Sequence, residues 1–88
     1  MLDNVFTGLT GGEWAVEGKK QKISVKFGPK FPVAVVYAPK NGAFVCFEPM
    51  ASQTNAFNMT QAGKDGSLQM IAAGGKWSES FFVTPAGF

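Results

Sequence analysis

Glu48 is the residue of this chain best suited to acid–base chemistry. It follows the apolar run 44–47 and precedes Pro49, so the sequence predicts a strand that ends at this carboxylate. Apolar neighbours, including Met50, would partly desolvate the carboxylate and make it a better proton acceptor near neutral pH. The alternative is that Glu48 is a solvated side chain at a strand end with no chemical role.

The chain offers Glu48 no partner of the usual kinds. Histidine is absent, which removes the commonest general acid and the commonest metal ligand. No Ser–His or Cys–His pair can therefore form within one chain. The single cysteine, Cys46, lies between aromatic residues and is interpreted as a small buried hydrophobe. It cannot form an intrachain disulfide, which fits a reducing, cytoplasmic location.

Charge is sparse and its type excludes some functions. The net charge of +2 comes from lysines alone, and the absence of arginine argues against a nucleic-acid or phosphate site that relies on bidentate contacts. The lysines of segment 19–22 could form an anion-binding patch, but a hairpin turn with a solvated strand face is the favoured interpretation. No signal peptide is expected, and the longest apolar run, 33–38, is too short to cross a bilayer.

Composition is that of one packed domain. With 88 residues, 45% apolar and only 16% charged, the chain is poorly charged for its size. Because a small domain has much surface to cover, part of its apolar surface could face another chain. Ordinary surfaces also expose apolar atoms, so this pattern alone does not decide the matter.

Strand signals dominate the chain. Alternation over 22–27 predicts a strand with one buried face, joined to a short segment at 14–16 by a turn at 17–20. Segment 33–38 is apolar on both faces and predicts a central strand covered on both sides. Asn41 and Gly42 predict a loop at 39–42 that leads into a strand at 43–48.

The second half is less regular. Residues 51–67 read as a long ordered loop with a helical turn near 55–60. A strand at 68–71, a turn at 72–75 and a last strand at 76–84, ended by Pro85, complete the chain. The sequence therefore predicts one all-β domain spanning residues 1–88.

Several blocks in order resemble the aldose 1-epimerase (galactose mutarotase) family. These blocks are 2–6 (LDNVF), 35–39 (VVYAP), 44–49 (FVCFEP), 55–58 (NAFN), 74–77 (GGKW) and 80–83 (SFFV). The resemblance covers essentially the whole chain but only about the last third of a family member. It implies an antiparallel β-sandwich fragment similar to the C-terminal part of a mutarotase supersandwich.

The resemblance also implies roles for individual residues. Glu48 matches the general base that acts on the anomeric hydroxyl of an aldohexose, and the family chemistry needs no metal or nucleotide cofactor. Asp3 matches an aspartate on a substrate-facing loop that binds sugar hydroxyls, and Asn55 is expected to be a further substrate contact. A histidine from an earlier part of the domain protonates the ring oxygen in the family. This chain lacks it, so efficient catalysis by the chain alone is not expected.

Two other interpretations stay open at this point. The chain could be a carbohydrate-binding module that uses Asp3, Glu48, Asn55 and an aromatic side chain, although Trp14, Trp77 and Tyr37 are each expected to be core residues. It could also be a structural or assembly protein without a ligand. In every case a sandwich fragment leaves open strand edges, so we expect a homo-oligomer or a complementary polypeptide, and neither a nucleic-acid nor a membrane partner.

Overall fold

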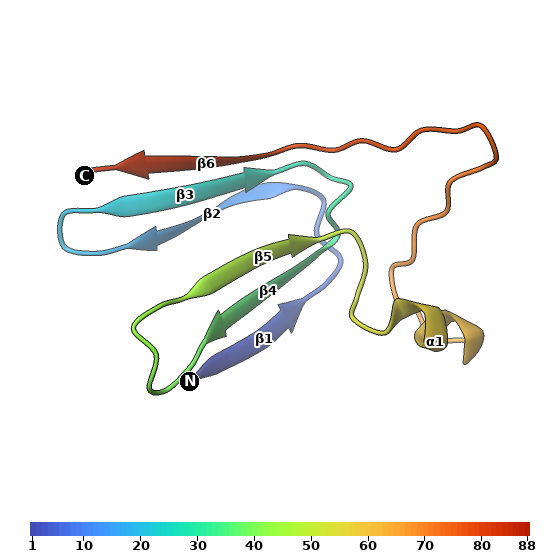
Figure 1. Ribbon diagram of the computed structural model, residues 1–88, viewed down its shortest axis with the longest axis horizontal. Coiled ribbons are helices and arrows are strands. Elements are labelled where there is room, and N and C mark those ends of the chain that lie inside the picture. The colour runs from blue at the N-terminus through green and yellow to red at the C-terminus, as the bar shows by residue number, and fades with distance from the viewer.

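The computed structural model describes residues 1–88 and contains six strands and one short helix (Figure 1). The elements are β1 (Leu2–Phe6), β2 (Gly12–Glu17), β3 (Lys22–Phe27), β4 (Val33–Ala38), β5 (Cys46–Met50), α1 (Ala56–Gln61) and β6 (Phe81–Ala86). The strands form two antiparallel three-stranded sheets. Sheet A has the order β1-β4-β5 and sheet B the order β2-β3-β6. The all-β prediction is confirmed.

An aromatic cluster joins the two sheets. Trp14 of β2 packs against Phe6 of β1 and Phe47 of β5, with ring centroids 5.0 and 4.8 Å apart. Phe27 of β3 adds a contact to Phe47 at 5.9 Å. These four side chains point inward because side chains alternate along a strand, so their neighbours in sequence point outward. Trp14 is half-buried and lies inside the aromatic cluster, so it belongs to the contact between the sheets and not to the fully buried core in which it was expected.

Each sheet is built from a predicted pair and one strand from elsewhere. The β2–β3 hairpin and the β4–β5 pair were both expected from turn signals, and β4 is the central strand of sheet A. Strand β1 joins sheet A on the free side of β4, and β6 joins sheet B on the free side of β3. Both of these pairings connect segments distant in sequence.

Several predicted boundaries are wrong. Pro49 does not stop a strand at Glu48 but lies inside β5, which begins at Cys46 and ends at Met50. Pro85 likewise lies inside β6, whose first residue is Phe81 rather than residue 76. Both prolines are tolerated because β5 and β6 are edge strands. Residues 68–71 form no strand, whereas the turn at 72–75 and the helical turn near 55–60 are present.

The pair of sheets is thin and incompletely covered. Its extents are 47 × 29 × 17 Å and its radius of gyration is 15.3 Å, against about 12 Å for a compact domain of this length. Only five residues are buried. Val33 and Ala34 of β4 are fully buried, but residues 35–38 are only half-buried. The prediction that this strand is buried on both sides is therefore wrong over most of its length.

The C-terminal part of the chain extends away from the sheets before it returns. Helix α1 lies beyond the end of β5, and an irregular arm, residues 62–80, leads from it back to β6 (Figure 1).

No helix in the structure has both the length and the apolar character needed to span a membrane.

Candidate functional site

The outer face of sheet A gathers the polar residues singled out from the sequence. The strand register places Asp3 of β1 opposite Tyr37 of β4, which in turn lies opposite Cys46 of β5. The next row on the same face contains Val5, Val35 and Glu48. Asp3, Tyr37 and Glu48 therefore share one surface although they come from three different strands.

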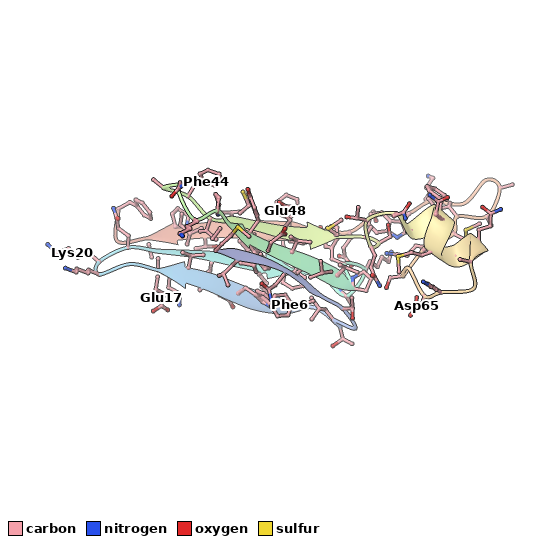
Figure 2. All side chains as sticks on the ribbon, turned by 90° about the horizontal axis from the view of Figure 1, so that it is seen from below. Phe6, Glu17, Lys20, Phe44, Glu48 and Asp65 are labelled. Atoms are coloured by element: carbon pink, nitrogen blue, oxygen red, sulfur yellow. The ribbon has the colours of Figure 1, made fainter.

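Glu48 projects from the middle of β5 into solvent. Its neighbour Phe47 points inward to Trp14, so the Glu48 side chain points away from the core. Glu48 is exposed (Figure 2), and the desolvation expected from its apolar neighbours in sequence is absent. The expectation of a partly buried carboxylate is therefore wrong for the isolated chain, because the alternation of a strand sends its apolar neighbours to the other face.

Asp3 lies in a strand and not in a loop, which corrects the position implied by the family resemblance. Its carboxylate is exposed, and its backbone N–H donates to Asn4 Oδ1 at 3.2 Å. Two strand spacings and two residues along the strand separate Asp3 from Glu48, or about 12 Å between their Cα atoms. One hexose, together with the lengths of the two side chains, can bridge such a gap.

Tyr37 lies between these two carboxylates in the strand order. It is half-buried and has Phe44 as its aromatic neighbour, with ring centroids 6.3 Å apart. An aromatic side chain on an open face can stack on the apolar side of a sugar ring. The sequence marked Tyr37 only as one of three aromatic candidates, and the register is what separates it from Trp14.

Asn55 lies apart from this face. It is the residue before α1, in the left-handed conformation with φ of 66°, and its Oδ1 accepts a hydrogen bond from Asn58 Nδ2 at 2.7 Å. Because α1 lies beyond the end of β5 whereas Asp3 is near the start of β1, the fold does not bring Asn55 and Asp3 together (Figure 1). The role of Asn55 in sugar binding stays a prediction.

A second polar cluster fixes the irregular arm to the loop between β3 and β4. Gln69 donates from Nε2 to the carbonyl oxygens of Lys30 and Ala51, at 2.8 and 2.6 Å, and accepts from Trp77 Nε1 at 2.7 Å. Lys30 Nζ donates to the carbonyl of Ser78 at 3.0 Å and lies 5.8 Å from the Trp77 ring centroid. Trp77 is thus occupied in a structural contact.

Glu79 completes this cluster, which we call the arm tether (Lys30, Gln69, Trp77 and Glu79). Its carboxylate accepts the backbone N–H groups of Ser80 and Lys30, both at 2.9 Å. These two hydrogen bonds, with that of Ser80 the larger effect, lower the pKa of Glu79 below its ordinary value. No pattern in the sequence predicts the arm tether, because its members lie up to 49 positions apart.

A cavity of about 290 Å³ opens between the sheets beside the aromatic cluster. All its lining residues are apolar: Trp14, Ala15, Val16, Ile23, Val25, Val36, Val45 and Phe47. A sugar needs hydrogen-bonding groups to fix its orientation, and this cavity supplies none from side chains. The carboxylates on the outer face of sheet A are therefore the better candidate for a polar ligand.

The remaining candidate groups have plain structural positions. Lys19 and Lys20 lie in the turn between β2 and β3, as the hairpin interpretation predicted, and Figure 2 shows Lys20 at the tip of this turn. Lys22 Nζ lies 3.6 Å from Glu17 Oε1 across the hairpin. Cys46 is free and half-buried on the outer face of sheet A, rather than buried in the core.

The chain was also compared with known proteins. No family model, no curated protein and no solved structure matches it.

Proposed function

We propose that the outer face of sheet A binds an aldohexose and that Glu48 is the general base for interconversion of its anomers. Asp3 binds sugar hydroxyls, and Tyr37 supports the ring between the two carboxylates. The observation that carries this proposal is the register of sheet A, which aligns Asp3, Tyr37 and Glu48 on one open face. On this reading the chain is an aldose 1-epimerase-like segment, similar to the C-terminal part of a mutarotase supersandwich.

The chemistry follows from the groups present. The Glu48 carboxylate takes the proton of the anomeric hydroxyl as the bond between the anomeric carbon and the ring oxygen breaks. The products of this step are an open-chain aldehyde and a ring oxygen that needs a proton. Rotation about the bond to the carbonyl carbon and reclosure then give the other anomer, and the protons return to their starting groups.

The histidine that protonates the ring oxygen in the resembled family must come from outside this chain. The chain has no histidine, so copies of itself cannot supply one. General acid catalysis typically contributes about 10²- to 10⁴-fold to a rate, so its loss leaves no rate that stands out above buffer. We infer that a second polypeptide carrying a histidine completes the site and also desolvates Glu48 by covering the outer face of sheet A.

Chemical rescue tests the role of Glu48 directly. Mutarotation of fresh α-D-glucose is followed by polarimetry with the chain alone, with imidazole alone and with both together near neutral pH. We expect the chain alone to match buffer, and the chain with imidazole to exceed the sum of the separate rates because imidazolium protonates the ring oxygen. Glu48→Gln should abolish this excess, whereas Glu13→Gln, an exposed acid on sheet B, should keep it.

A rate that is additive in imidazole, or an excess that survives Glu48→Gln, would contradict the assignment of Glu48 as base. Folding of each variant is checked by circular dichroism, so that loss of the excess is not mistaken for loss of structure.

Carbohydrate binding without catalysis is the second candidate function. The position of Tyr37 between two exposed carboxylates supports it, since stacking and hydrogen bonding alone can hold a sugar. NMR titration with galactose or glucose separates the two functions. Amide shifts confined to β1, β4 and β5, without imidazole rescue, would favour binding alone, whereas the absence of shifts at high millimolar sugar would exclude both.

A further inference from the structure

We propose that two copies of this chain associate through β1, which pairs antiparallel with β1 of the partner and makes one six-stranded sheet from the two copies of sheet A. The pairing is centred on Asn4. This interface does not depend on the sugar-binding proposal, because it uses the free edge of β1 and not the carboxylates of the outer face.

The chain exposes more surface than a domain of its mass should. Its accessible surface is 6597 Å² at 9.4 kDa. A folded monomer of that mass exposes about 5,000 Å². The excess of about 1,600 Å² on one chain is about twice the area of about 800 Å² that each partner buries in a standard protein–protein interface. Part of this surface is apolar side chains of strands, including Leu2, Val5 and Phe6 of β1, which are 50, 57 and 40% exposed.

Two of the four edge strands are blocked by proline. The N–H of Asp3 bonds to Asn4 Oδ1, which indicates that odd-numbered residues of β1 face the open side and even-numbered ones face β4. Phe6 lies opposite Ala34, and because Phe6 faces β4, the backbone groups of Ala34 point toward β1 and not toward β5. Pro49 lies opposite Ala34 on the other side, so the backbone of Pro49 points to the open side of β5. This edge lacks an N–H where an added strand would need one.

The same alternation applies in sheet B. Gly28 donates its N–H to the carbonyl of Ser80 at 3.2 Å, so even-numbered residues of β3 face β6. The backbone groups of the odd-numbered Ile23 therefore point toward β2. Pro85 lies opposite Ile23, so the backbone of Pro85 points to the open side of β6. Edge prolines of this kind are a common protection against unwanted strand pairing.

The third edge, β2, is disfavoured for self-pairing by its charge. Its outward-facing backbone groups belong to Glu13, Ala15 and Glu17, whose side chains lie on the outer face of sheet B. Antiparallel pairing of β2 with its own copy would bring four glutamates onto adjacent strands. Like charges in such positions destabilise a strand pair.

Strand β1 has neither obstacle. Its sequence, LDNVF, contains no proline, and Asp3 and Val5 present their backbone groups to the open side. Pairing with the partner's β1 replaces the exposed hydrogen bond from the Asp3 N–H to Asn4 Oδ1 with one to the partner's backbone. Pairing centred on Asn4 places Asp3 opposite the partner's Val5, so that no carboxylate faces another. It also places Leu2 opposite the partner's Phe6, an apolar pair on the inner face.

This pairing includes every residue of β1 and leaves no second β1 edge free for a third copy. All five residues of β1 pair, and the contact is the same on both copies, so it produces a dimer and not a filament.

Proline substitution tests which edge is used. The Val5 N–H faces the open side, so Val5→Pro should leave the intrachain ladder intact and remove two intermolecular hydrogen bonds per dimer. We expect the dimer dissociation constant, measured by sedimentation equilibrium over about three decades of concentration, to rise about 5- to 150-fold. Ala15→Pro, at an equivalent position of the β2 edge, should leave it unchanged.

A monomeric wild-type chain throughout this range would overturn the proposal, as would a larger effect of Ala15→Pro than of Val5→Pro. Circular dichroism establishes that each variant is folded before its association is compared.

A cross-link tests the register independently of proline. In the proposed pairing the two Asn4 residues form a directly opposed pair across the dyad, with Cβ atoms about 4.5–5.5 Å apart, near the range that a disulfide spans. In a Cys46→Ser background, Asn4→Cys should oxidise to a covalent dimer, whereas Ala15→Cys should not. Failure of Asn4→Cys to cross-link more than Ala15→Cys would overturn the Asn4-centred pairing.

Discussion

The two faces of sheet A are made by the same three strands and do opposite things. The inner face contributes Phe6 and Phe47 to the aromatic cluster that joins the sheets, whereas the outer face carries Asp3, Tyr37 and Glu48 in the open. The difference is sharpest between Phe47 and Glu48, which are adjacent in sequence and point in opposite directions. Phe47 stabilises the fold and the next residue, Glu48, is the candidate for chemistry, because successive side chains of a strand point to opposite faces.

A second comparison concerns two glutamates, the exposed Glu48 and the half-buried Glu79. Glu79 accepts two backbone N–H groups and holds the arm against the loop between β3 and β4, while Glu48 has no hydrogen-bond partner within the chain. A carboxylate satisfied by the backbone serves the fold. A carboxylate left open on a strand face is available to a ligand.

Phe47→Ala should have the largest effect on stability, because it removes a packed side chain from the inner face of sheet A. Removal of the ring takes away contacts to Trp14 and Phe27 and enlarges the cavity between the sheets. Because Phe47 is half-buried, we expect a loss of about 2–4 kcal/mol in the free energy of unfolding, below the upper values for fully buried phenylalanine. Urea unfolding followed by tryptophan fluorescence measures this loss.

Phe44→Ala is the matched control for that experiment. Phe44 is 57% exposed and lies outside the aromatic cluster, so the same substitution should cost less than about 1 kcal/mol. Equal losses at the two positions would show that the inner face does not dominate the stability of the fold.

Acid should act on the fold through Glu79. Its pKa is lowered in the folded chain, so the stability that it contributes is present above the ordinary pKa of glutamate and is lost as the pH falls through the lowered value. Thermal midpoints measured between about pH 7 and about pH 2 should fall less steeply for Glu79→Gln than for the wild type. If the thermal midpoint of Glu79→Gln falls with pH as steeply as that of the wild type, the arm tether does not make the fold sensitive to acid.

Glu48→Gln should have the smallest effect on stability. It shows how little a side chain on the outer face of sheet A contributes to the fold. The side chain is exposed and makes no hydrogen bond within the chain, so the free energy of unfolding should change by less than about 0.5 kcal/mol. Chemical denaturation of this variant beside Phe47→Ala compares two neighbouring positions in one experiment. A loss above about 1 kcal/mol would assign Glu48 a structural role.

Local patterns in the sequence predicted the elements that depend on neighbours in the chain. The short segment 14–16, the alternation at 22–27 and the apolar segment 33–38 correspond to β2, β3 and β4, and the turn residues 39–42 led to the β4–β5 pairing. The helical turn near 55–60 is α1. These features depend on backbone preferences and side-chain period, which a single sequence displays.

The errors fall where partners come from far away. Edge position decided whether Pro49 and Pro85 could lie inside strands, and edge position depends on which strands assemble beside them. Residues 68–71 have strand-like composition but pair with no strand, and this part of the chain is held instead through the side chain of Gln69. The degree of burial of β4 was overestimated because composition does not reveal whether a covering layer exists.

For the candidate site, the sequence by itself determined which chemical groups are available: a few carboxylates, aromatic side chains and no histidine or arginine. It thereby excluded a histidine of this chain as the acid partner of Glu48. Only the tertiary structure decided that Asp3, Tyr37 and Glu48 share a face, that Trp14 and Asn55 do not belong with them, and that Glu48 is open to solvent. The physical reason is that residue type is a local property, whereas the face on which a strand residue lies depends on hydrogen-bonded register with strands more than 30 residues away.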